Sequence, residues 1–297
     1  MIGELMDLPF DLLGNAIISG LLLGGFYAAI TIGITISFGM LDIVNIAHPA
    51  FILLGSYTAY LANSILGLDP ILSGCILLPA FYALGVAIYQ VYNIAFEGRS
   101  GSSMLGLAFF FGLLFITEVS LVLVFGVDYR LVEAPYVGPS LHAESIDLPL
   151  RLLVPFLVSL ALIGALQLFM SRTFIGRALQ AVAQDPQALR LMGARPAGIK
   201  RIGFALSIAT TSIAGAILIV VQPVEPSIGR DYVGRIFAIC VLGGLGNFAG
   251  TVAAAMILGI VESLTATFYG PSWAPAVAFG LLLAALTVRP AGLLGRR

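Results

Sequence analysis

The chain has 297 residues, of which 60% are hydrophobic and only 10% are charged, and its formal net charge is -1. Soluble domains carry roughly 25% charged residues, so this balance excludes an ordinary soluble domain and indicates a chain that lies in membrane lipid. We expect no nucleic-acid partner, no cofactor and no metal site.

Apolar runs predict an all-α, polytopic membrane protein with about eight transmembrane helices plus broken or re-entrant segments, because roughly 20 apolar residues cross a bilayer core. A single transmembrane domain is expected over residues 1–297. The first fourteen residues contain acids and no base, so the first run is expected to remain a helix rather than a cleaved signal peptide. The expected spans are approximately 15–38, 43–62, 71–92, 103–125, 152–171, 202–222, 236–266 and 273–288.

A first interruption is predicted between Gly39 and Pro49, since polar Asp42, Asn45 and His48 precede a proline that cannot continue a helix ladder. Irregular backbone at membrane depth survives only where protein buries it or water reaches it, so such a break marks a candidate transport pathway. His48 is a candidate substrate contact or proton relay, and the alternative is that it bonds a freed backbone carbonyl.

Two carboxylates fall within apolar runs, Glu118 and Glu262. An intramembrane carboxylate is costly and is a functional candidate by default. The alternative is that each reaches the interface or bonds a neighbouring helix. Cys75 and Cys240 lie in apolar runs without metal-ligand spacing, and we interpret them as buried small hydrophobes.

The loop at 172–201 is predicted to be ordered. Its first part has apolar residues on one helical face, and Asp185 followed by Pro186 is typical of the start of a second helix, which Gly193 would end. By the positive-inside rule the loop is cytoplasmic, which places the N-terminus outside and the C-terminus inside. The basic residues on this side are Arg99, Arg172, Arg177, Arg190, Arg195, Lys200, Arg201, Arg289, Arg296 and Arg297.

The run at 236–266 must itself be broken, since one crossing would leave the C-terminus on the wrong side. The glycine-rich stretch Gly243, Gly244, Leu245, Gly246 and Asn247 is the expected position. A glycine-rich packing face is the alternative. Both breaks contain an asparagine shortly before a long helix, which suggests that the two halves of the chain are structural repeats.

These motifs together resemble the permeases of branched-chain amino acid ABC transporters. The resemblance covers nearly the whole chain and is carried by 38–39, 45–48, 54–57, 241–246, 288–295 and the cytoplasmic loop. It departs from the family pattern at Asp42, where a small or apolar residue is usual, and at Pro49, where glycine is usual. The loop residues that match the family's ATPase-coupling segment are Gly176, Arg177, Ala178, Ala181, Gln184, Asp185, Pro186 and Gly193.

The resemblance implies a non-enzymatic permease subunit of an importer in the bacterial inner membrane, moving branched-chain amino acids or related solutes. The implied partners are a second related permease, two cytoplasmic ATP-binding subunits and an extracellular or periplasmic solute-binding protein. The chain has no GxxxxGK[ST] phosphate loop of its own. Outer loops 126–151 and 223–235 are expected to meet the binding protein.

The expected pathway residues are Asn45, His48, Gly243, Gly244, Gly246 and Asn247. Related permeases carry urea, amides or other small carboxylates, so the resemblance does not identify the solute of this chain. A secondary transporter coupled to ions through Glu118, Glu262 and His48 is the alternative function, but it would leave the capped cytoplasmic helix unexplained.

Overall fold

The computed structural model describes residues 2–96, 102–143, 146–288 and 292–294. Part of the predicted charge pattern, namely Arg99, Arg289, Arg296 and Arg297, lies outside the described residues, as do 290–291 and Gly295 of the last family motif.

Seven of the described helices are long and apolar enough to cross a membrane, which confirms the predicted all-α polytopic fold. Two further helices have 15 residues each and, at about 1.5 Å per residue, are shorter than a full hydrocarbon core. The long helices are α1 (Ile2–Ser37), α2 (His48–Leu66), α3 (Pro70–Ala95), α4 (Ser102–Phe125), α5 (Leu150–Arg172), α8 (Pro196–Val221) and α10 (Phe248–Phe268). The two shorter ones are α9 (Gly229–Gly243) and α11 (Ala274–Val288).

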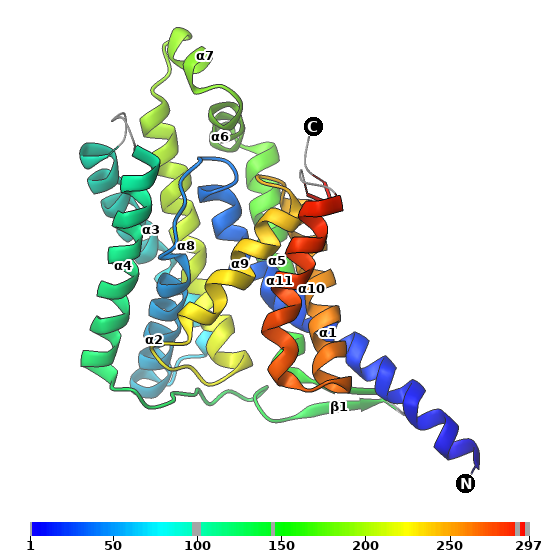
Figure 1. Ribbon diagram of the computed structural model, residues 1–297. Coiled ribbons are helices and arrows are strands. Elements are labelled where there is room, and N and C mark those ends of the chain that lie inside the picture. Colours follow the sequence, from blue (N-terminus) through cyan, green and yellow to red (C-terminus); the bar gives the residue numbers. More distant parts are fainter. Residues whose placement is uncertain (1, 97–101, 144–145, 289–291, 295–297) are drawn as a thin grey trace.

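Smaller elements lie at the two ends of the bundle (Figure 1). At the upper end in this view are α6 (Phe174–Gln184) and α7 (Pro186–Leu191). At the lower end β1 (Ser140–Ala143) pairs antiparallel with β2 (Ile146–Pro149), within a region expected only to be a loop. The 3₁₀ turn η1 (Pro271–Trp273) links α10 to α11.

Helix α8 forms the centre of the molecule. In its most apolar window 94% of the residues are buried, whereas the corresponding share is 22% for α3 and α4 and 17% for α5. Helices α1, α2, α3 and α5 pack on α8, and α10 packs on α1. The largely apolar exposed faces of α3, α4 and α5 therefore form the periphery that would meet lipid.

Glycines allow the central helices to approach closely. A Cβ added to Gly20 would lie 2.6 Å from the Cα of Ile260, and one added to Gly24 would lie 2.7 Å from the Cα of Met256. The two glycines are four residues apart on α1, the spacing by which small residues form helix contacts in membranes. The α1–α10 contact is therefore made largely backbone to backbone.

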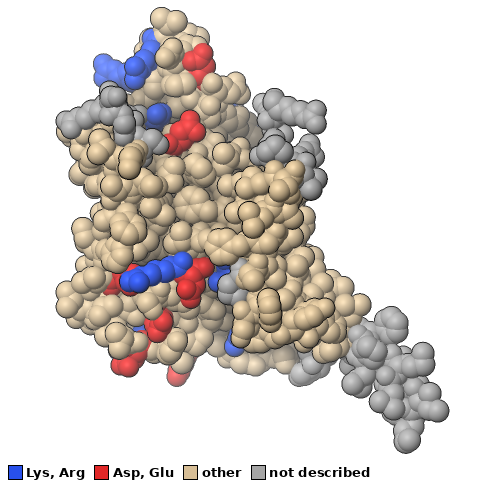
Figure 2. All heavy atoms as spheres, in the orientation of Figure 1, with Lys and Arg blue, Asp and Glu red and all other residues tan. Residues whose placement is uncertain are grey.

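Charged side chains gather towards the two ends of the molecule. Figure 2 shows a band without charged side chains on the visible face, with both basic and acidic side chains above and below it. The loop at 172–201 supplies charge to the upper end, and loops beyond α4 and α8 supply the lower. This distribution is that of a membrane-spanning bundle.

We predict that Gly215→Ala destabilises the α2–α8 contact by about 1–3 kcal/mol, because the added methyl group overpacks a closed seam. It would lie 2.5 Å from the backbone nitrogen of Ser56. The control is Gly164→Ala on α5, where nothing lies within 4 Å of the added Cβ. Thermal unfolding in detergent should show a lower Tm for the first variant, and equal Tm values would contradict this packing.

Candidate functional site

The first break separates α1 from α2 as predicted. Helix α1 ends in a tight turn in which the amide of Ile43 donates to the carbonyl of Ser37 at 2.9 Å, and Asp42 adopts a left-handed conformation with φ of 57°. The chain is then non-helical until His48, and Pro49 occupies the first turn of α2. In Figure 1 this segment descends from the upper end of α1 to the start of α2 near mid-height of the bundle.

The polar side chains of this break are enclosed by protein. Asn45 is fully buried, and neither of its amide atoms has a hydrogen-bond partner among the described residues. His48 is 1% exposed, and its Nδ1 atom also lacks a partner there. The absence of a side chain at Gly33 leaves room for the His48 ring, beside Ser207 of α8. Both predicted pathway residues therefore lie in the packing between helices.

The second break separates α9 from α10, which confirms that the run at 236–266 is two helices. Gly244 and Gly246 have φ of 95° and 77°, a left-handed region that favours glycine. Asn247 caps α10, since its Oδ1 atom accepts a hydrogen bond from the amide of Gly250 at 3.0 Å. Asn45 has no such capping role, because the N-cap position of α2 is Ala47.

The two breaks meet. A Cβ added to Gly246 would lie 2.7 Å from the carbonyl oxygen of Gly39, so neither position has room for a side chain. Beside this contact is an open cavity of about 510 Å³. Carboxamides supply much of its polar lining, and none of its lining residues is charged. The lining residues are Gly39, Met40, Gln167, Gln180, Ala183, Gln184, Leu245, Gly246, Asn247, Phe248, Ala249 and Leu294.

Helix α7 has the predicted start and end signals. The side chain of Asp185 accepts hydrogen bonds from the amides of Gln187 and Ala188 at 2.8 and 2.9 Å, and Pro186 begins α7. Gly193, with φ of 81°, follows its end. Sequence alone was sufficient here because each of these signals is local.

Some of the predicted coupling residues pack against neighbouring helices, and others are exposed. Gly176 lets α6 approach the end of α5, where an added Cβ would lie 2.5 Å from the Cα of Met170. Arg177 and Gln184 are exposed, whereas Ala178 and Ala181 are half-buried. At the end of α7 the apolar side chains of Leu191 and Met192 are 91% and 77% exposed, although sequence analysis did not single them out.

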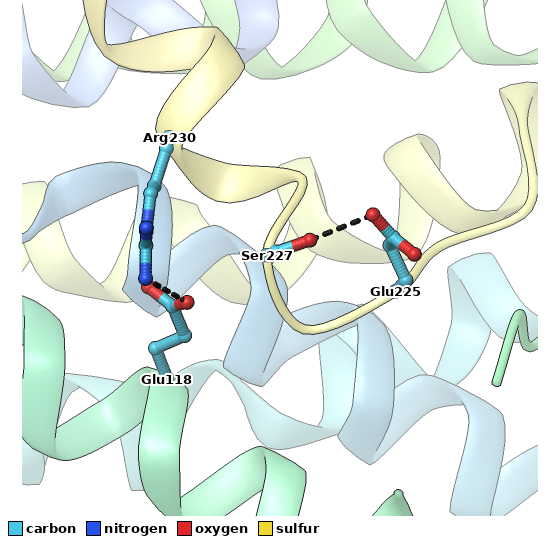
Figure 3. A network of polar contacts seen from close by, with 4 residues as sticks. All are labelled: Glu118, Glu225, Ser227 and Arg230. Atoms are coloured by element: carbon cyan, nitrogen blue, oxygen red, sulfur yellow. Dashed lines mark hydrogen bonds and ion pairs between the residues drawn. The ribbon is translucent and has the colours of Figure 1, made fainter. Parts of the chain in front are cut away.

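Two arginines of α9 bind the two intramembrane carboxylates. Arg230 donates from Nε to Oε2 of Glu118 at 2.8 Å and from Nη2 to Oε1, and Figure 3 shows this paired contact between α9 and α4. Arg235 donates from Nη2 to Oε1 of Glu262 on α10 at 2.9 Å. At about 100° per residue the arginines point about 140° apart around α9, so they reach different helices.

This pairing supports the alternative role for both glutamates, which was bonding to a neighbouring helix. Arg230 belongs to the 223–235 segment, for which contact with the binding protein is expected, but its guanidinium binds Glu118. Nearby, Ser227 donates to Glu225 at 2.6 Å (Figure 3). Sequence reasoning identified the carboxylates but not their partners, since the pairs join residues far apart in the chain.

The loops that follow α4 and α8 form a second polar region, which lies over the end of α2. Backbone hydrogen bonds of 2.8 and 2.9 Å join Arg130 to Val224, and the Asn63 amide pairs with the backbone of Glu133. A cavity of about 520 Å³ lies there, lined by Tyr60, Asn63, Ser64, Gly67, Leu131 and Glu133.

The same loop is tied to the start of α3. The Tyr136 hydroxyl donates to Asp69 at 2.8 Å, while the other oxygen of Asp69 caps α3. Burial, and after it this hydrogen bond, raises the pKa of Tyr136, so the phenol remains a donor at neutral pH. The loop is therefore held against the bundle.

Comparison with known proteins gives one consistent family. Residues 16–286 match the family model described as branched-chain amino acid transport system / permease component. The permease protein BraD of the high-affinity branched-chain amino acid transport system of Pseudomonas aeruginosa is 28% identical, with 94% of this chain and 95% of BraD covered. The corresponding LivH protein of Escherichia coli strain K12 is 27% identical, with 94% of each chain covered.

A solved structure supports the fold. PsaBC from Streptococcus pneumoniae, in complex with a Fab, matches with a TM-score of 0.50 and 15% identity, covering 98% of this chain and 97% of that one. At this identity the likeness concerns the fold alone.

We predict that Glu262→Gln destabilises the protein more than Glu118→Gln does. The side chains of Arg235 and Glu262 are 16% and 6% exposed, so removing one charge leaves the other buried without its partner, at a cost of about 3–5 kcal/mol. Arg230 is 56% exposed and can turn to water or headgroups. Thermal unfolding of both variants in detergent measures the order, and a larger effect for Glu118→Gln would contradict it.

Proposed function

Because the chain belongs to the family of branched-chain amino acid transport system permease components, we propose that it is the membrane-spanning subunit of an ATP-driven importer. Its proposed solutes are branched-chain amino acids or related small amino-acid-like molecules, and it performs no catalysis itself. The observation that carries the proposal is the family match over residues 16–286, joined to a capped helical loop that projects beyond the spans.

Helices α6 and α7 are the proposed contact with the ATP-binding subunits. A loop that only joined α5 to α8 would need a few residues, yet this one contains two capped helices. Leu191 and Met192 present apolar surface that a soluble partner would bury. The proposed coupling residues are Gly176, Arg177, Ala178, Ala181, Gln184, Asp185, Pro186 and Gly193.

The two breaks are the proposed inner part of the solute pathway. Leu245, Gly246 and Asn247 line the 510 Å³ cavity, and Gly243 and Gly244 precede them in the chain. Asn45 is proposed to contribute in another state of the transport cycle, since its buried amide has unused hydrogen-bonding capacity in this one. His48 beside it would move with the same segment.

The proposed orientation follows the basic residues. Loop 172–201 would be cytoplasmic, which places the N-terminus outside and the C-terminus inside a bacterial inner membrane. The outer loops over α2 would then face a solute-binding protein, and exposed Val127, Tyr129 and Leu131 offer it apolar contacts. A second, related permease would complete the pathway.

Ion-coupled secondary transport is the less favoured alternative. Such a mechanism would use Glu118 or Glu262 to bind the coupling ion, but each carboxylate already binds an arginine. The positive charge of a bound arginine opposes the binding of a coupling cation at the same carboxylate.

We predict that replacing residues 185–193 with a flexible linker abolishes ATP-dependent solute uptake and ATPase association while the chain stays folded. The measurement is uptake into vesicles containing this chain and its partner subunits, with size-exclusion chromatography as the test of folding. Uptake that persists without any ATPase and follows an ion gradient would instead favour secondary transport.

A narrower change should separate contact from folding. Leu191→Asp combined with Met192→Asp is expected to weaken binding to the ATPase at least about tenfold, because burying two carboxylates in an apolar contact is costly. Gln187→Asp is the control, since it adds a charge at another exposed position of α7. Equal effects of the two changes on pull-down of the ATPase would contradict apolar docking.

A further inference from the structure

Residues 292–294, which follow α11 in the chain, lie against the second helix break. The amide of Leu293 donates to the carbonyl of Leu242 at 2.7 Å, and the amide of Leu294 donates to the carbonyl of Gly243 at 3.4 Å. Asn247 donates from Nδ2 to the carbonyl of Leu294 at 2.7 Å. The segment therefore bonds the end of α9 and the N-cap of α10 at once.

The fit between the segment and the break is close. Gly292 has φ of 80°, and a Cβ added there would lie 2.6 Å from the amide nitrogen of Gly244 and 2.7 Å from the carbonyl oxygen of Val241. On the other side, a Cβ on Gly250 of α10 would lie 3.3 Å from the Cβ of Leu294. Glycine is required at 292 both by its backbone conformation and by the space available.

Few backbone hydrogen bonds lie within the break itself. Its internal backbone hydrogen bonds are from Gly244 to Val241 and from Asn247 to Gly244, both at 3.1 Å, and two of its glycines are in left-handed conformations. The last carbonyls of a helix have no partner within that helix. At the end of α9, the segment after α11 supplies two of the donors.

We propose that residues 292–294 and Asn247 form a clamp that fixes the angle between α9 and α10, and that this clamp positions the break for coupled transport. These are positioning residues. Asn247 and Leu294 also line the 510 Å³ cavity, so opening the clamp would change the shape of its wall. The transport part of this inference rests on the proposed importer function, whereas the clamp itself does not.

The variant Asn247→Asp keeps one hydrogen bond of this side chain and removes the other. A carboxylate still accepts from the Gly250 amide and so keeps the helix cap, but an ionised carboxylate cannot donate to Leu294. Leu293→Pro is an independent variant that removes the donor to Leu242 without adding charge. Leu293→Ala is its matched control, because it shortens the side chain and retains the N–H group.

The first readout is amide hydrogen exchange over residues 244–251 in the assembled complex. Loss of one hydrogen bond should speed exchange by about 3–10-fold in Asn247→Asp and Leu293→Pro, with Leu293→Ala close to wild type. The second readout is solute imported per ATP hydrolysed in proteoliposomes. We expect it to fall at least about threefold in the two clamp variants while assembly with the ATPase is retained.

Unchanged exchange in both clamp variants would overturn the clamp, and wild-type coupling in both would overturn its role in transport. Loss of assembly in both would reduce the segment to a structural brace and overturn its positioning role. If the wild-type complex imports nothing while the exchange difference is present, the importer assignment and the coupling role both fail, and the clamp remains only as a feature of the fold.

Discussion

A backbone that leaves a helix inside a membrane must find hydrogen-bond partners within the protein, because lipid offers none. The structure meets this constraint differently at its two interruptions. At the first, the chain turns back on α1, with Ile43 bonded to Ser37, and is enclosed by neighbouring helices. At the second, a segment from the far end of the chain supplies the missing donors to α9. The cavity and the proposed pathway lie where these two solutions meet.

Close backbone contact is the second requirement of this architecture. Hydrophobic burial drives helices together only weakly in lipid, so association depends on packing and polar contacts. Glycines let α10 pack closely on α1, and they let α2 pack closely on α8. Helix α8 is almost wholly buried. The short helix α9 is also tied by charge, through Arg230 to α4 and through Arg235 to α10. These ion pairs add to a buried apolar face of α9 that includes Tyr232, Ile236 and Ile239.

Features specified by neighbouring residues could be predicted from the sequence. The cap at Asp185 and Pro186, the break at Gly243 to Asn247 and the membrane spans all follow from local signals. Interactions between distant residues could not be predicted in this way. Pairing of 292–294 with the α9 end and of Arg230 with Glu118 depends on three-dimensional placement.

The two asparagines of the breaks show the same limit. Each lies shortly before a long helix in the sequence, yet Asn247 caps its helix and Asn45 does not. A pattern of a few residues thus indicated two breaks correctly without specifying how each side chain is used.

The contact between Gly39 and Gly246 has a mechanical consequence. No side chain lies between the two breaks, so their backbones touch directly. No flexible group is present there to absorb a displacement of one break relative to the other. The seam of glycines along α1 and α10 extends this stiffness away from the contact. A displacement of either break is therefore transmitted directly to the other.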